Sequence, residues 1–426
     1  MNSIALKLFP DMVSSDDRAR IFMTAVVVGS LPLLMIFPTS AGWLAGVLTV
    51  IGFVALLRRR DFNRMNMHFA ILCLIFPVAQ LWNMAVMGWA PGYLFRPTHL
   101  LWGLMIYFLI GYYGIHRNAL FYSSCLASFV AFGIAIFEAL YLGHTRVFGL
   151  GERWNAVPFG NFSMLFGFFS LCGAFTSSKR QLSGRLVLGV AGFACGFLAS
   201  VLSGTRGGWL AIPFLLVLCF FFNDRLSKRW RSIAIIAIAL SIALVFAGSQ
   251  RIRDRIDTAV HHVSSYLAHP SNVAAESTST GLRLSMWHWG IEKFREHPFT
   301  GIGLAAYKDE KKAAVEAGEV PAPFEGFANL HNEFITSLAL GGIPAAGALI
   351  AFWIMGWRFF SSRLKSMDDD QHYFALCGLV TILGTGLFSM TESLFGTSPG
   401  TKAIMLALAL PAGALRYVIV KRNVPA

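Results

Sequence analysis

Long apolar runs dominate this chain and leave few folds open to it. Runs of roughly 16–24 residues recur from Ile21 to Val420, and each is long enough, or nearly so, to cross a hydrocarbon layer of about 30 Å. The backbone must satisfy its own hydrogen bonds in lipid, and the alternating ten-residue segments of a membrane barrel are absent. Because 56% of the 426 residues are hydrophobic and only 13% are charged, the sequence predicts an all-α polytopic membrane protein.

About twelve membrane spans are expected from the hydropathy pattern. They cover residues 21–37, 41–57, 67–86, 99–115, 119–142, 156–176, 186–203, 209–222, 232–247, 342–360, 372–390 and 403–420. The chain is therefore expected to have three parts. These are nine spans within residues 1–247, a large outer loop over residues 248–330, and three further spans within residues 331–426.

Basic residues predict the orientation, because Lys and Arg collect in short cytoplasmic loops. One set of alternate loops and ends holds only five of them, Arg96, Arg146, Arg153, Arg206 and Lys402. The opposite set holds Lys7, Arg18, Arg20, Arg58, Arg59, Arg60, Arg64, Arg117, Lys179, Arg180, Arg185, Arg225, Lys228, Arg229, Arg231, Arg363, Lys365, Lys421 and Arg422. Both termini are thus expected in the cytoplasm, and the loop 248–330 on the outer side of the membrane.

The formal net charge of +13 follows from these topology signals, which face anionic lipid, so no nucleic-acid partner is expected. All six cysteines fall inside predicted spans and are interpreted as core packing rather than as disulfide or zinc ligands.

The outer loop is the one segment of soluble character. An amphipathic helix is expected near its start, and "GLRLSMWHWGIEKFREHP" predicts a helix that stops before Pro298. "FTGIGLAAY" then supplies a glycine-marked turn, and "YKDEKKAAVEAG" predicts a charged, solvated helix. A loop this long inside a compact protein is usually functional or disordered, and its helical patterning and aromatic residues favour function.

A short outer turn, "SGTRGGWLA" from Ser203 to Ala211, could bind an anion. Glycines on both sides of Arg206, including Gly207 and Gly208, let the backbone turn tightly and bring main-chain N–H groups close to a ligand. The guanidinium would offer planar, paired donors that suit phosphate. The alternative is a turn whose arginine only reaches lipid headgroups.

Arg283 in "TGLRLSMWHW" is a second candidate. It lies four residues before Trp287, so both share one face of the predicted loop helix. The alternative is an interfacial helix whose arginine touches lipid phosphate.

The third candidate lies in "NLHNEFITSLALGGIP", where polar residues precede an apolar run. Asn332 or Asn329 could cap a helix and leave His331 an incidental interfacial residue. In a helix's first turn, however, the positive end of the helix dipole would resist protonation of His331 and leave a neutral imidazole as a general base. Glu333 could orient His331 or complement the dipole.

A metal site is not expected. Asp368–Asp370 resembles the acidic motif by which many sugar-nucleotide transferases hold a divalent ion, but the topology places it inside, where it is interpreted as a solvated charge run. The outer side shows no obvious carboxylate pair, so a phosphorylated substrate there would be neutralised by arginines.

Together, "SGTRGGWLA", the loop motif "TGLRLSMW…HPFTGIGL" and "HNEFITSLALGGIP" resemble the bacterial O-antigen ligase and polymerase superfamily in sequence, order and placement. The ligase pattern of an arginine followed four residues later by leucine falls on Arg206 and Leu210. The family's loop arginine falls on Arg283, and its histidine before a glycine pair falls on His331.

The resemblance implies a metal-independent, inverting glycosyl transfer that needs no cofactor. The donor would be O-antigen polysaccharide on undecaprenyl pyrophosphate, and the acceptor a sugar hydroxyl of lipid A–core. His331 would act as general base, with Arg206 and Arg283 on the pyrophosphate and Asn332, Trp287, Gly207 and Gly208 near the substrates. The alternatives are an O-antigen polymerase, a protein O-oligosaccharyltransferase, or a lipid or polysaccharide transporter.

Overall fold

The all-α prediction is confirmed, since every regular element in the described part of the chain is helical. The structure, a computed structural model, describes residues 15–39, 41–59, 64–94, 96–150, 154–175, 182–222, 229, 232, 279–364 and 368–423. The predicted span 232–247 and the helix expected near the start of the outer loop lie outside these residues.

Nine helical segments of the described chain are long and apolar enough to cross a membrane. They are formed by α2 (Ser15–Ile36), α3 (Ala41–Arg59), α4 (Arg64–Met87), α7 (Ala119–Ile136) with the π-helix η2 (Phe137–Tyr141), α8 (Ala156–Ala174), α9 (Leu182–Leu202), α16 (Glu333–Ser361), α17 (Asp369–Phe388) and α18 (Ser398–Asn423).

Two shorter apolar helices, α6 (His99–Tyr113) and α10 (Ile212–Phe221), match two further predicted spans. The 3-10 helix η4 (Gly207–Ala211) leads into α10, and the short α5 (Pro91–Leu94) follows α4. The chain is therefore a multi-pass membrane protein, and all predicted spans within the described residues correspond to helices.

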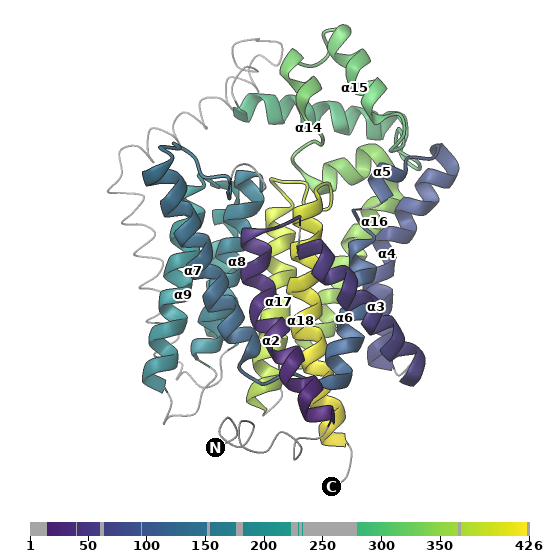
Figure 1. The fold of residues 1–426 in the computed structure, drawn as a ribbon. Coiled ribbons are helices and arrows are strands. Elements are labelled where there is room, and N and C mark those ends of the chain that lie inside the picture. The colour runs from purple at the N-terminus through teal and green to yellow at the C-terminus, as the bar shows by residue number, and fades with distance from the viewer. Residues whose placement is uncertain are drawn as a thin grey trace.

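The beginning of α2 and the end of α18 lie at the same end of the bundle (Figure 1). Arg20 near the start of α2 donates to the carbonyl of Ile115 at 3.4 Å, and its guanidinium lies 5.6 Å from the ring centre of Tyr417. Asp368 caps α17 at this end by accepting from Gln371 N at 2.8 Å. The acidic run thus begins as a helix cap, on the side of the bundle opposite the outer loop.

Helix α8 lies inside the bundle, and all of its residues are buried. It packs closely against α9 because glycines of α9 leave no side chain in the way. A Cβ at Gly189 or Gly196 would lie 2.6 or 2.4 Å from the carbonyl oxygens of Ser170 and Ser163. Small residues of this kind let membrane helices approach one another.

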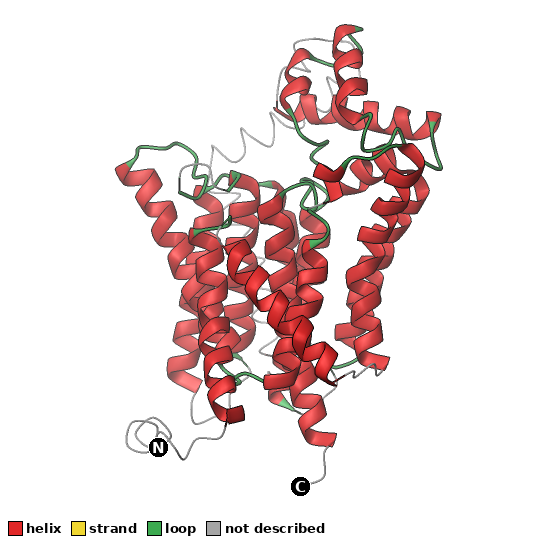
Figure 2. Ribbon diagram, turned by 45° about the vertical axis from the view of Figure 1, so that its right-hand side comes forward, coloured by secondary structure: helices red, strands yellow, loops and turns green. Residues whose placement is uncertain are grey.

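The outer loop contributes α14 (Ser279–Glu296), α15 (Tyr307–Glu316) and the 3-10 helix η5 (Ala322–Gly326), which lie above the end of the bundle opposite the termini (Figures 1 and 2). α14 ends before Pro298, as predicted. The prediction of a solvated α15 is only partly right, because Lys311 is buried and donates to the carbonyl of Phe327 at 2.7 Å.

Helix α16 changes direction at Gly342, whose φ of 63° and ψ of −160° break the helix. A Cβ there would lie 2.5 Å from the backbone of Phe299, so only glycine fits without a shift. Pro344 has no N–H to donate to the carbonyl four residues earlier. The kink therefore leaves main-chain groups of α16 that need other partners.

The turn between α14 and α15 supplies these partners and fastens the outer loop to the bundle. Three main-chain bonds join the two segments: Ile302 N to Ala339 O at 2.9 Å, Gly303 N to Leu340 O at 3.1 Å, and Ile343 N to Pro298 O at 2.8 Å. The buried Asn83 of α4 adds two more, from Nδ2 to Thr300 O at 2.7 Å and from Leu304 N to Oδ1 at 3.3 Å.

Candidate active site

His331 lies two residues before α16, at the end of the bundle over which α14 and α15 lie (Figure 1). Asn332 is the N-cap residue, and its Oδ1 accepts from Phe334 N at 3.0 Å and Ile335 N at 3.1 Å. The prediction that His331 lies in the first helical turn is therefore wrong. The helix dipole consequently gives no reason to expect a neutral imidazole. Instead, His331 has a left-handed φ of 51°, a conformation uncommon for a residue other than glycine.

A buried carboxylate faces the imidazole. Both oxygens of Glu392 lie 3.2 Å from Nδ1 of His331, and the Glu392 side chain is 2% exposed whereas that of His331 is 13% exposed. The carboxylate also accepts from Ser393 N at 3.2 Å. A carboxylate in this position fixes which ring nitrogen carries the proton.

Glu333 does not orient His331. Its carboxylate is buried and accepts from Phe395 N at 2.9 Å, while its own N–H donates to Ser389 O at 2.8 Å. Glu333 thus joins the start of α16 to the turn between α17 and α18, which carries Glu392. The prediction that Glu333 could orient His331 is therefore wrong. The carboxylate that faces His331 belongs to Glu392, 61 residues later in the chain.

The turn that carries Arg206 packs directly on the turn that carries Glu392. A Cβ at Gly207 would lie 2.4 Å from Oγ1 of Thr391, and a Cβ at Gly208 would lie 1.9 Å from Oδ1 of Asn161. Arg206 itself is exposed. The two glycines therefore let the Arg206 turn approach both the α17–α18 turn and α8.

Arg146 is a further cation at this end of the bundle, between η2 and α8. Its Nε donates to Ser203 O at 3.0 Å, within the same short turn. The buried Glu138 holds the Arg146 loop by accepting from the backbone N–H groups of Phe148, at 2.7 Å, and Leu150. Glu138 thus positions this loop and with it Arg146.

Arg283 approaches from the outer loop. It lies one helical turn before Trp287, whose Nε1 donates to Leu330 O at 2.8 Å, directly beside His331. The ring of Phe327 packs against the imidazole of His331: the two ring centres are 5.2 Å apart and the ring planes are nearly perpendicular. The face shared by Arg283 and Trp287 is therefore the face that α14 turns toward the His331 segment.

The charges of these groups act on one another. Burial lowers the pKa of the Arg146 guanidinium, the charges of Arg283 and Arg206 lower it further, and Glu392 opposes them. The charges of Arg206, Arg283 and Glu392 thus all act on Arg146. Direct contacts join the Arg146 loop to the Arg206 turn and that turn to Thr391, the neighbour of Glu392; Arg146, Arg206 and Arg283 are called the arginine cluster below.

The sequence also predicted that four further residues lie near the substrates, namely Asn332, Trp287, Gly207 and Gly208. The structure shows which protein groups each of them contacts. The amide of Asn332 is engaged by the helix start and by Met390 O, to which Nδ2 donates at 3.0 Å. Trp287 donates to Leu330 O, whereas Gly207 and Gly208 permit close packing. Substrate contact by any of the four stays a prediction.

Arg146 and Glu392 were not selected from the sequence. Arg146 is one of the five basic residues on the predicted outer side, where the topology rule expects few Lys or Arg. This unexpected position could have marked Arg146 as a candidate site residue. Glu392 gave no comparable signal, because it follows a predicted span and resembles an ordinary polar loop residue.

Comparison with known proteins shows what part of this chain is similar to. Residues 191–350, which include Arg206, Arg283 and His331, match a family model described as O-antigen ligase. A protein of Haemophilus influenzae described as uncharacterized is 22% identical over 308 residues, which cover 72% of this chain and 75% of the relative. Residues 191–350 of this chain are therefore similar to the O-antigen ligase family.

Proposed function

We propose that this protein is a lipopolysaccharide O-antigen ligase, which transfers O-antigen polysaccharide from undecaprenyl pyrophosphate to a sugar hydroxyl of lipid A–core. The observation that carries the proposal is the His331–Glu392 pair at 3.2 Å, whose glutamate lies on a turn that packs against the Arg206 turn, which also holds Arg146. This arrangement joins a proton acceptor to a binding site for a strongly anionic group.

His331 acts as the general base. Glu392 accepts a hydrogen bond from the Nδ1–H group, so the proton stays on Nδ1 and the lone pair is on Nε2. As the acceptor hydroxyl attacks the anomeric carbon, its proton passes to Nε2, and Glu392 stabilises the imidazolium that forms. His331 is partly exposed while Glu392 is buried, as expected for a base that meets substrate and a partner that does not.

The arginines hold the leaving group. The bond between the anomeric carbon and the diphosphate oxygen breaks, and its electron pair leaves with the undecaprenyl diphosphate. Arg206, Arg283 and Arg146 would bind that group and stabilise the negative charge that grows on its oxygen. Attack on the face opposite the leaving group inverts the anomeric configuration, and three guanidinium groups can provide this neutralisation without a metal ion.

The proposed orientation puts this cluster in the periplasm of a bacterial inner membrane and both termini in the cytoplasm. Both substrates are lipids, and both would reach the outer end of the bundle from within the membrane. The outer loop, fastened over the bundle by the kink of α16, would cover them from the water side.

Reconstitution of the purified protein with undecaprenyl-diphosphate glycan and lipid A–core tests the proposal. His331→Ala should reduce the formation of a glycan ladder on lipopolysaccharide by about 10²–10⁴-fold, because the base is lost. His288→Ala provides the matched control, since His288 is exposed on α14 and should keep normal activity.

Full activity of His331→Ala would rule out the base. A ladder on the undecaprenyl carrier would favour a polymerase, and label that crosses the membrane without a new glycosidic bond would favour a transporter. Loss of activity with EDTA would contradict charge neutralisation by arginine alone.

A further inference from the structure

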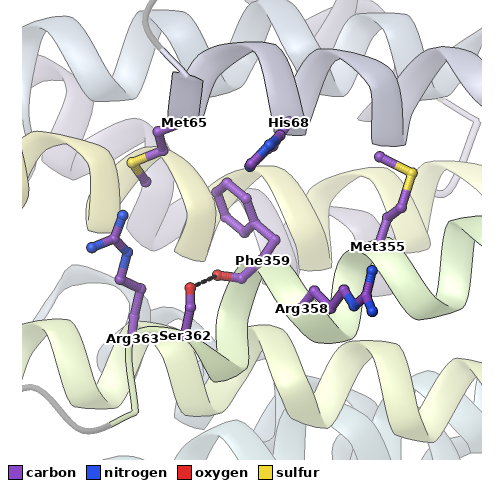
Figure 3. Close-up of a pocket in the computed structure, with 7 residues that line it drawn as sticks. All are labelled: Met65, His68, Met355, Arg358, Phe359, Ser362 and Arg363. Carbon is purple, nitrogen blue, oxygen red and sulfur yellow. Dashed lines mark hydrogen bonds between the residues drawn. The ribbon is translucent and has the colours of Figure 1, made fainter.

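A cavity of about 570 Å³ lies between α4 and α16 (Figure 3). Its residues come from the start of α4 and from the end of α16 and the residues directly after it, so it lies at the end of the bundle opposite the outer loop. It is far from the candidate active site, since Phe359 in its wall lies about 26 Å along the helix beyond the kink at Gly342. Its lining consists of Met65, His68, Met355, Arg358, Phe359, Ser362 and Arg363.

The walls combine apolar and cationic groups. Met65, Met355 and Phe359 provide the apolar surface, and Figure 3 shows the Phe359 ring lying between the two helices, toward His68. Both guanidinium groups come from α16 and the residues that directly follow it. The cavity thus offers an apolar floor between two positively charged side chains.

Arg358 and Arg363 form no ion pair within the part of the chain that the structure describes, and Arg358 is exposed. Cationic pockets between membrane helices at the level of the headgroups are suited to anionic lipids. Arginine suits this task because its planar donors match phosphate oxygens.

We propose that this cavity binds the headgroup of one anionic phospholipid. The phosphodiester would contact Arg358 and Arg363, and the glycerol and the first part of the acyl chains would lie along Met65, Met355 and Phe359. The volume is within the range of small-molecule sites. A zwitterionic headgroup would bind less well, because its ammonium would lie near two guanidinium groups without a described carboxylate to receive it.

A second cavity between the same helices lacks this chemistry. About 480 Å³ in volume, it is lined by Ile75, Val78, Ala79, Trp82, Pro344, Gly347 and Ala348. It offers no charged side chain, so it cannot select a headgroup.

Binding can be measured on the full-length, delipidated protein in detergent, by native mass spectrometry and by thermal unfolding. Phosphatidylglycerol should bind about tenfold more tightly than phosphatidylethanolamine and should raise the unfolding temperature. Arg358→Gln or Arg363→Gln should remove most of this preference. Arg58→Gln is the matched control, because Arg58 is an exposed arginine near the end of α3 at the same end of the bundle.

Met355→Trp tests the cavity without a change of charge. It should fill the space and weaken phosphatidylglycerol binding, while the unfolding temperature without lipid stays near that of the wild type. Undiminished binding by Met355→Trp, or equal losses in Arg58→Gln and Arg358→Gln, would overturn the proposal. So would equal binding of the two lipids, or displacement of the lipid by millimolar inorganic phosphate.

Discussion

At the scale of single residues, the site depends on pairing each polar group with a partner from another part of the chain. Glu392 faces His331, and Glu333 accepts from Phe395 N. The two glutamates lie at the same end of the bundle and are both buried, but only one touches the proposed base. Their different partners predict different consequences of the same substitution.

Glu392→Gln should lower glycan transfer by roughly 10²-fold or more, because a neutral amide cannot stabilise the imidazolium and can present the wrong group to Nδ1. The rate of ladder formation on lipid A–core, at equal amounts of folded protein, measures the effect. Glu333→Gln is the control and should retain activity within about threefold, since Gln can still accept from Phe395 N. Equal losses in both variants would show that Glu392 acts only structurally.

At the scale of elements, the site is a meeting of chain segments that connect helices. The Arg206 turn and the α17–α18 turn touch, with no room for a Cβ at Gly207 beside Thr391. The loop with Arg146 is held against the same turn by Ser203 O. The spacing between the arginines and His331 is therefore set by how tightly these turns pack.

Gly207→Ala should lower transfer by about tenfold or more, because the new Cβ forces the Arg206 turn away from Thr391 and a small misplacement of a binding group is costly. The double variant Gly207→Ala/Thr391→Gly should recover part of the activity by giving the methyl group room. Gly46→Ala is the control, as no atom lies within 4 Å of the position that a Cβ would take there, and alanine favours a helix. Failure of the double variant to recover any activity would argue against this contact as the cause.

At the scale of the whole molecule, the outer loop and the bundle form one body. The kink of α16 exposes main-chain groups, the turn after α14 satisfies them, and Asn83 of α4 fastens the same turn from the other side. Arg283 is delivered to the cluster by the loop, whereas Arg206 and His331 belong to the bundle. The attachment of the loop to the bundle therefore decides whether Arg283 lies near Arg206 and His331.

Asn83→Ala should weaken the attachment, because it leaves the Thr300 carbonyl and the Leu304 N–H without a partner, at about 1–3 kcal/mol for each buried group. Faster proteolysis within residues 297–306 and reduced transfer should accompany a lower unfolding temperature. Gln80→Met is the control one turn away, since Oε1 of Gln80 is buried without a hydrogen-bond partner in the described structure, and it should not destabilise the protein. Unchanged proteolysis of Asn83→Ala would contradict this role.

The sequence by itself determined the helical membrane fold, the boundaries of most spans and the two candidate arginines with the candidate histidine. These properties depend on local quantities, namely the length of apolar runs, the positions of glycine and proline, and the distribution of basic residues. The stop of α14 before Pro298 and the cap of α16 are of the same kind.

Only the tertiary structure decided which carboxylate meets His331 and that Arg146 joins the cluster. Glu392 lies 61 residues after His331, and Arg146 reaches Ser203 across 57 residues, so neither contact leaves a periodic trace in the chain. The choice of Glu333 from its nearness in sequence was wrong because a side chain at the start of a helix points where that helix packs, here toward Phe395. Contacts between turns are fixed by the packing of the helices that they connect, and that packing is a property of the whole bundle.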